Sequence, residues 1–404
     1  MQSRRAIIIV SIAAISGLFL FFIGFKKNSI TVMTGSTEAD KSDSIPLIGG
    51  LFGGEKALPE PIPETPTAGK LASVPQKINA LYSTSWSASS SKKIDYFIDL
   101  AKKTSANAIV IDIKDYSGIL AYESSDETVK KYATSEKRIG DLEGLVKKLH
   151  DNGIYAIARV TVFQDPALAA KRPDLAVKNS KTGEVWLDNK KLAWLDPASK
   201  EVWEYTAAIA REAAAKGFDE VNFDYVRFPS DGNLNVLSYP FYNSEAKTKS
   251  ESIKEFFVYL REKTAGEKIS ADIFGLTVIA SDDMGIGQII EDALGNFDFI
   301  CPMVYPSHFA NGFIGYKNPA DHPYEVIKHS MEEAGKRLAS WKEANPGKES
   351  GAIRPWLQDF DLGAEYGTEE VMAQVRATEE TSNEGWMMWS PNNIYTSEAI
   401  ILND

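Results

Sequence analysis

The sequence predicts an α/β fold, a (β/α)8 TIM barrel, preceded by an N-terminal transmembrane helix and a disordered linker. From about residue 76 to residue 404, short β-rich runs alternate with amphipathic helical patterns. Strands separated by helices pair in parallel through right-handed crossovers. An open doubly wound sheet is the alternative, but that fold usually carries a glycine-rich phosphate loop after its first strand. The first run here is followed by STSWSASSS, which disfavours the open sheet.

Eight β-rich runs match the eight strands that such a barrel needs. Between them, KKIDYFIDLAKKT at 92–104 places its apolar residues on one helical face. The helical patterns at 139–153 and 200–217 each end at glycine, which suits a helix C-terminus. The predicted strands are residues 79–86, 107–114, 153–160, 219–226, 268–275, 298–305, 351–357 and 384–390.

The N-terminus holds an apolar run long enough to cross a membrane. Residues 6–25 form 20 consecutive residues without a charge, a length of about 30 Å as a helix. Arg4 and Arg5 precede the run and favour a cytoplasmic N-terminus. A cleaved signal peptide is the alternative, but the run exceeds the usual apolar region of about 7–15 residues. We therefore expect residues 1–27 to be an uncleaved signal anchor that places the following domain outside the cell membrane.

A tether is predicted between this anchor and the barrel. Residues 28–75 are rich in Gly, Pro, Ser and Thr, and ALPEPIPETPTAGK at 57–70 repeats proline. Repeated prolines favour an extended, semi-rigid chain. The barrel domain is therefore expected at residues 76–404.

Composition excludes several classes of protein. The chain has 44 Lys+Arg and 56 Asp+Glu, a formal net charge of −12, which argues against a nucleic-acid binder. Its one cysteine, Cys301, excludes a disulfide within the chain and cysteine-rich zinc modules.

Strand ends supply the candidate site, because a barrel of this class carries its site at the C-terminal ends of its strands. Side chains alternate along a strand. In the second run three alternating isoleucines should face the helices, which turns Asp112 and Lys114 inward. The same parity in the fourth run turns Asn222 and Asp224 inward. Further candidates at or near strand ends are Asp115, Arg159, Arg227, Asp272, Tyr305, His308, Gln358 and Asp359.

Carboxylates at one rim indicate chemistry, because a buried carboxylate is costly unless it is paired or hydrogen-bonded. Glycoside hydrolysis uses two carboxyl groups, one as acid and one as nucleophile or base. When two carboxylates are held close together, their like charges raise the pKa of one of them, and that group then keeps its proton. Asp224 and Asp272, on neighbouring strands, suit these roles. The alternative is a structural ion-pair network with Lys114, Arg159 and Arg227.

Tryptophans at strand ends favour a sugar ligand, since pyranose faces stack on flat aromatic rings. Trp86, Trp356 and Trp389 have this position, although such residues can also close the top of a barrel. No cofactor or metal is expected. A metal site built from Asp112, Asp115 and His308 is the alternative for this rim, and the other histidines lack ligand spacing.

Several of these segments resemble a bacterial family of TIM-barrel envelope proteins, the putative glycoside hydrolase family that was formerly a domain of unknown function. GFDEVNFDYVRFPSDG at 217–232 resembles its fourth-strand motif most specifically. The resemblance covers about residues 78–404. The other matching segments are TSWSASS at 84–90, IDIKDYSG at 111–118, ARVTVFQDP at 158–166, ADIFG at 271–275, PMVYPSHF at 302–309 and RPWLQDF at 354–360.

The resemblance implies a barrel distantly related to alpha-amylase-like glycosidases, in which a fourth-strand Asp is the nucleophile and a fifth-strand carboxylate is the acid/base. By position these are Asp224 and Asp272, although the wider group generally carries Glu on the fifth strand. Arg159 and Arg227 would hold the carboxylates ionised. The residues expected to contact sugar are Asp112, Tyr305, His308, Gln358, Asp359, Trp86, Trp356 and Trp389.

We therefore expect a membrane-anchored glycoside hydrolase that acts on an envelope or extracellular polysaccharide without a cofactor. A non-catalytic carbohydrate-binding or cell-wall scaffold barrel is the first alternative. A metal-dependent deacetylase or hydrolase is the second.

Overall fold

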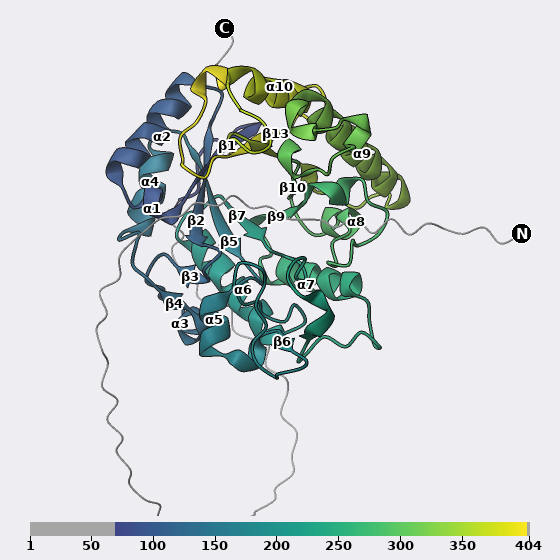
Figure 1. Cartoon of the computed structure of the whole chain (residues 1–404). Coiled ribbons are helices and arrows are strands. Elements are labelled where there is room, and N and C mark those ends of the chain that lie inside the picture. Colours follow the sequence, from purple (N-terminus) through teal and green to yellow (C-terminus); the bar gives the residue numbers. More distant parts are fainter. Residues whose placement is uncertain (1–68, 402–404) are drawn as a thin grey trace, which may run out of the picture. The chain divides into compact units, whose positions relative to one another are not determined.

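Eight parallel strands close into a barrel in residues 69–401, the part of the chain that the computed structural model describes (Figure 1). Their order is β1-β2-β5-β7-β9-β10-β12-β13, and β13 pairs with β1 to complete the ring. This closure confirms the predicted barrel and excludes the open sheet. The strands are β1 (Ile78–Ser83), β2 (Ala108–Lys114), β5 (Tyr155–Thr161), β7 (Glu220–Asp224), β9 (Lys268–Phe274), β10 (Phe299–Met303), β12 (Trp356–Gln358) and β13 (Gly385–Trp389).

The seventh strand is interrupted at a proline. A short strand, β11 (Ala352–Ile353), pairs with β10 before β12 begins. Pro355 lies between them and has no N–H for the ladder, although its carbonyl accepts from Met387 N. The other short strands are β3 (Ile119–Leu120), β4 (Thr134–Ser135), β6 (Lys178–Asn179) and β8 (Leu237–Ser238).

Helices surround the strands (Figure 1). In α2, the Ser90 side chain caps the first turn by accepting from Lys93 N, and the apolar face predicted from the sequence is buried. The helices are α1 (Ser85–Ala88), α2 (Ser91–Lys103), α3 (Glu127–Tyr132), α4 (Leu142–His150), α5 (Pro166–Lys171), α6 (Lys200–Ala215), α7 (Lys249–Lys263), α8 (Ile290–Leu294), α9 (Pro323–Ala344) and α10 (Thr368–Glu379). Single 3-10 turns occupy Pro173–Leu175, Leu234–Val236, Gly275–Val278, Pro306–His308, Phe313–Gly315, Pro319–Asp321 and Ser397–Ile400.

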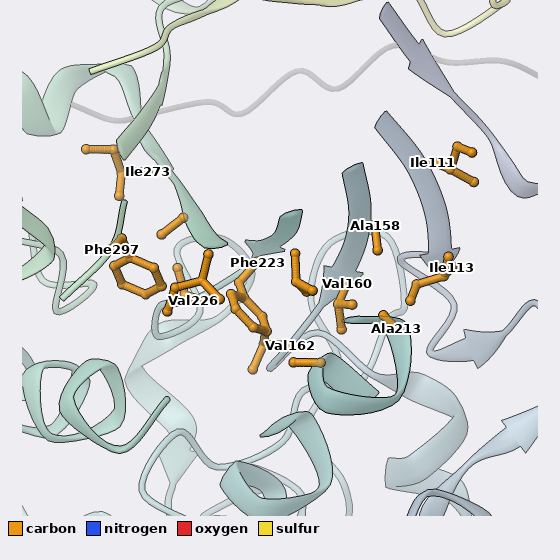
Figure 2. Packing of buried hydrophobic residues seen from close by; sticks show 14 of the residues in the cluster. Ile111, Ile113, Ala158, Val160, Val162, Ala213, Phe223, Val226, Ile273 and Phe297 are labelled. Carbon is orange, nitrogen blue, oxygen red and sulfur yellow. The ribbon is translucent and has the colours of Figure 1, made fainter. Parts of the chain in front are cut away.

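The core has two layers, one between the strands and the helices and one inside the barrel. Strand parity decides to which layer a residue belongs. Ile111 and Ile113 belong to the layer between strands and helices, whereas Val110 lies in the cluster inside the barrel. Figure 2 shows part of the outer layer, where Val160 and Phe223 also pack. The predicted parity is confirmed in the fourth strand and, as far as Ile113, in the second strand.

A β-bulge reverses the direction predicted for Lys114. The register of β2 against β5 shifts after Asp112, so that Lys114 pairs with Val160. The Lys114 ammonium lies 2.8 Å from Asp165 Oδ2 and 5.6 Å from the ring centroid of Tyr205 in α6. The prediction that Lys114 points into the barrel is wrong, because the extra residue of a bulge breaks the alternation.

The N-terminal end of the barrel is covered by the start of the described chain. Leu71 joins the cluster inside the barrel, and its N–H donates to Asp219 Oδ1 at 2.8 Å. Asp219 Oδ2 also lies 2.8 Å from His150 Nε2. Packing on the barrel therefore begins within the range predicted as linker, at Lys70 and Leu71.

The predicted transmembrane helix at residues 6–25 and most of the predicted linker lie outside the described residues, and both stay predictions. Within residues 69–401, no helix combines the length and the apolar character that crossing a bilayer requires.

A buried ion pair near the N-terminal end of the barrel gives a test of the fold. Arg354 Nη2 lies 2.5 Å from Glu220 Oε1, and both side chains are fully buried. Ser270 Oγ donates to the same Glu220 oxygen. Glu220→Ala should lower the free energy of unfolding by about 3–5 kcal/mol, because it leaves the Arg354 charge buried without its partner. Urea denaturation measures the loss.

The matched control removes both charges. Glu220→Leu combined with Arg354→Met should recover most of that loss, since apolar residues of similar volume often replace a buried ion pair at little cost. A Glu220→Ala protein as stable as the wild type would contradict this view of the pair.

Candidate active site

Three carboxylates from different strands surround the guanidinium of Arg159 at the barrel mouth. Arg159 extends from β5, and its Nη1 lies 2.5 Å from Asp112 Oδ1 on β2. Its Nη2 donates to Asp224 Oδ2 on β7. Its Nε lies 3.6 Å from Asp272 Oδ2 on β9. All four side chains are at most 8% exposed. One guanidinium cannot neutralise three carboxylates, so the cluster favours retention of a proton on one of them.

Asp272 is the carboxyl group placed to hold that proton. Its Oδ1 accepts from Asn222 Nδ2 at 2.9 Å and from Trp356 Nε1 at 2.7 Å. Burial raises the pKa of Asp272 to about 8, and the charge of Asp224 adds to the rise, against the opposing effect of Arg159. With both hydrogen bonds made at Oδ1, Oδ2, which lies 3.6 Å from Arg159 Nε, is the oxygen left to carry the proton at neutral pH.

Asp224 is held at the end of β7 by its own chain and by Arg159. Its Oδ1 accepts from Tyr225 N at 2.5 Å. Tyr225 has a φ of 55°, the left-handed region that residues other than glycine rarely adopt. Such strain persists only where surrounding contacts enforce it, and it clusters at functional sites. The turn therefore fixes the direction of the Asp224 carboxylate.

Asp112 is bonded to a tyrosine that the sequence analysis did not select. Tyr82 Oη donates to Asp112 Oδ2 at 2.5 Å, and its ring stacks on Trp389 with centroids 3.8 Å apart. Burial raises the pKa of Asp112, although Arg159 opposes the shift. Strand parity carried the signal for Tyr82, because it shares the inward parity of Ala80, which also lies inside the barrel.

Two predicted sugar contacts keep polar atoms available at the mouth. Burial raises the pKa of Tyr305, and the charges of Asp272 and Asp224 raise it further, so its phenol stays protonated. Among the described residues the Tyr305 hydroxyl has no hydrogen-bond partner. His308 is exposed, with Nδ1 3.0 Å from Ser307 Oγ.

Arg227 does not share the predicted role of Arg159. It forms no ion pair within residues 69–401, and its Nη1 donates to Ser230 Oγ at 3.1 Å. Its guanidinium packs 4.4 Å from the ring centroid of Phe274 and 4.8 Å from that of Trp194. Neighbouring rings therefore take the place of the predicted carboxylate partners.

Gln358 and Asp359 form hydrogen bonds with residues of loops. Gln358 is fully buried, and its Oε1 accepts from Ser307 Oγ at 2.8 Å. Both carboxylate oxygens of Asp359 accept from Thr396, one from its N–H and one from its hydroxyl, each at 2.8 Å. These bonds occupy the oxygens that were expected to meet sugar hydroxyls.

The three strand-end tryptophans have different surroundings. Trp86 is 58% exposed, and Trp389 is partly buried in its stack with Tyr82. Trp356 is 1% exposed and donates to Asp272, so its predicted role as a sugar platform is wrong. Its polar edge, the indole N–H, is the part that belongs to the site.

The residues of the alternative metal site, Asp112, Asp115 and His308, do not form a cluster. Asp112 faces Arg159, while Asp115 Oδ2 lies 2.6 Å from Arg138 Nη1, outside the Arg159 cluster. Across residues 69–401, no group of three or more His, Cys, Asp or Glu side chains has an arrangement that could hold a metal ion.

Several solved structures are similar to this chain. A hypothetical protein from Ruminiclostridium thermocellum is 42% identical over 48% of this chain and 96% of its own, with a TM-score of 0.44. The glycoside hydrolase domain of PgaB (BpsB) from Bordetella bronchiseptica is 14% identical over 81% of this chain and 99% of its own, with a TM-score of 0.54. An alpha-galactosidase from Thermus thermophilus is 14% identical over 81% of this chain and 60% of its own, with a TM-score of 0.46.

Family membership rests on the match in sequence. No protein with a curated description matches the chain. The family model described as a putative glycosyl hydrolase domain matches residues 80–395, nearly the whole barrel. This match confirms the resemblance predicted from the strand-end motifs. The chain belongs to this putative glycosyl hydrolase family.

Proposed function

We propose that the protein hydrolyses glycosidic bonds of a polysaccharide, with Asp224 as the nucleophile and Asp272 as the acid/base. One observation carries the proposal: Asp224 and Asp272, on neighbouring strands, both lie at the Arg159 guanidinium, and burial raises the pKa of Asp272 to about 8. A protonated acid beside a second carboxyl group is the pair that glycoside hydrolysis requires.

The strand register favours a retaining mechanism. Phe223 of β7 pairs with Ala271 of β9, so Asp224 and Asp272 are the next residues on the two strands. Neighbouring strands lie about 4.7–4.9 Å apart. Retaining enzymes place their carboxyl groups about 5–5.5 Å apart, whereas inverting enzymes need about 6.5–9.5 Å to admit water.

The chemistry then follows in two steps. Asp272 gives its proton to the glycosidic oxygen as that C–O bond breaks, while an Asp224 oxygen bonds to the anomeric carbon. Water next attacks this carbon, Asp272 takes a proton from the water, and the bond to Asp224 breaks. The Arg159 guanidinium, which contacts Asp224, orients this side chain for attack on the anomeric carbon. We further propose that residues 6–25 anchor the barrel outside the cell membrane, where its substrate would be an envelope or extracellular polysaccharide.

The proposal is tested by release of reducing ends from glycol chitin, galactomannan, soluble starch and peptidoglycan. New reducing ends from at least one of them support hydrolysis. A non-catalytic carbohydrate-binding barrel is the second candidate, favoured by the burial of Asp112 and Asp224 against Arg159. Binding without any release would support that candidate instead.

The raised pKa of Asp272 predicts the pH dependence of activity. Activity on substrates with poor leaving groups should fall as pH rises through about 8, because Asp272 then loses the proton it must donate. A kcat/KM profile between pH 5 and 10 measures this limb. Unchanged activity up to pH 10 would contradict the assignment of Asp272 as the acid.

The pH dependence of folding stability should also reflect the ionisation of Asp272. The pKa of Asp272 is higher in the folded chain than its ordinary value of about 3.9. Between these values the folded state holds more protons than the unfolded state, so the Asp272 contribution to stability falls as pH rises from about 4 to about 8. Denaturation at several pH values, compared with Asp272→Asn, isolates this contribution.

A further inference from the structure

Two large aromatic side chains project into solvent, one from α1 after β1 and one from the loop after β2. Trp86 is 58% exposed and Tyr116 is 59% exposed. Exposed aromatic residues that gather on one surface mark binding sites more often than single ones do. The strands beneath them are neighbours, since Ser83 at the end of β1 pairs with Ile111 of β2.

One guanidinium joins α1 to the loop after β2. Arg138 Nη1 lies 3.1 Å from Ser85 Oγ and 2.6 Å from Asp115 Oδ2, and these residues immediately precede Trp86 and Tyr116. Arg138 therefore links the two segments that carry Trp86 and Tyr116.

The same guanidinium supports the indole of Trp86. Its carbon Cζ lies 4.6 Å from the ring centroid of Trp86, and its Nη2 lies 2.8 Å from Glu136 Oε2. The Arg138 side chain is only 6% exposed. With Arg138 held by two carboxylates, the indole rests on a fixed support and keeps more than half of its surface open. A platform held this way loses little side-chain freedom when a ligand stacks on it.

The platform adjoins the Arg159 cluster. Asp112 follows Ile111 in β2, contacts Arg159 and precedes the Asp115 loop by three residues. The Asp224–Asp272 pair lies on the other side of Arg159, on β7 and β9. A sugar chain cleaved at that pair can extend across Arg159 towards the β1–β2 rim, so the platform would meet sugar units remote from the scissile bond.

We propose that Trp86 and Tyr116 form an outer subsite for a polysaccharide chain. The placement of that chain rests on the proposed function, whereas the subsite itself is a binding surface. It makes the substrate a polymer of several sugar units rather than a short oligosaccharide.

Affinity electrophoresis tests the subsite without requiring turnover. The purified full-length protein in mild detergent is run through native gels that contain glycol chitin, galactomannan or soluble starch, with Asp224→Asn as the background. Retardation by at least one polymer is expected. Trp86→Ala combined with Tyr116→Ala should raise the apparent dissociation constant for that polymer about tenfold, since each ring adds a modest stacking energy.

Two controls separate the subsite from general surface or folding effects. Met372→Ala removes an apolar side chain that is 47% exposed on α10, outside the two segments joined by Arg138, and should leave retardation unchanged. Trp86→Phe combined with Tyr116→Phe keeps both rings and should restore most of the retardation.

Equal retardation of the double alanine variant and its parent would overturn the subsite, and so would a parent retarded by none of the three polymers. Reducing-end assays distinguish this from failure of the proposed hydrolysis. A wild type that is retarded through Trp86 and Tyr116 but releases no reducing ends keeps the subsite and loses the hydrolase. If the wild type cleaves the polymer but the double alanine variant is retarded as strongly as its parent, the proposed hydrolysis is kept and the subsite is lost.

Discussion

Asp224→Asn is expected to lower kcat for polysaccharide hydrolysis by roughly 10³-fold or more, because an amide cannot replace the carboxylate as nucleophile. The fold should survive the change. The asparagine keeps an oxygen of nearly the same position, and Arg159 retains its contact with Asp112 at 2.5 Å. Initial rates of reducing-end release, together with thermal unfolding, measure both expectations.

Two further readouts make the assignment of Asp224 specific. The charge of Asp224 contributes to the raised pKa of Asp272, so Asp224→Asn should also lower the pKa of Asp272. Asp224→Gly with added azide should recover glycosyl transfer, because the small anion can enter the space left by the carboxylate and attack the anomeric carbon.

Asp99→Asn, which removes an exposed carboxylate from α2, is the matched control and should leave activity unchanged. Hydrolysis by Asp224→Asn at the wild-type rate would contradict the role of Asp224 as nucleophile.

The barrel itself could be predicted from the sequence because its periodicity is local. Alternating apolar residues determine which face of a strand enters the core, and eight such runs with helices between them leave few topologies. The same parity predicted that Asp224 points into the mouth, and position near a strand end selected Asp272 and Arg159. All three lie in one cluster in the structure.

Partners of these residues could not be predicted in the same way. Parity gives the face of a strand but neither the depth along the barrel axis nor the neighbour across it. Trp356 was expected at the end of the seventh strand, yet it is the first residue of β12 and lies deep enough to donate to Asp272. The prediction for Lys114 is wrong because a β-bulge shifts the register by one residue, and a β-bulge has no plain signal in the sequence.

The loops after the strands were the least predictable part of the site. Asp115 follows Asp112 by only three residues, yet it turns to Arg138, which lies between β4 and α4. Gln358 and Asp359 bond to loops that follow β10 and β13. Contacts between distant segments of the chain decide these cases, and a single sequence carries no information on which loop will reach which.

Asp272→Asn should lower kcat/KM for polysaccharide by roughly 10²- to 10⁴-fold, the usual contribution of general acid–base catalysis. The loss in the first step should be much smaller for an aryl glycoside with a dinitrophenolate leaving group, which needs no proton to depart. Pre-steady-state release of the phenol measures that step. The fall in activity above pH 8 should disappear with the acid.

Destabilisation of the fold cannot explain that pattern of activity, because asparagine imitates the protonated form of Asp272. Its carbonyl oxygen can accept from Asn222 and Trp356 as Asp272 Oδ1 does, and its amide replaces the protonated oxygen. The variant should therefore be more stable than the wild type at pH 9, where ionised Asp272 opposes folding. Equal losses on polysaccharide and aryl glycoside, with lower stability at pH 9, would assign Asp272 to the framework of the barrel instead of to proton transfer.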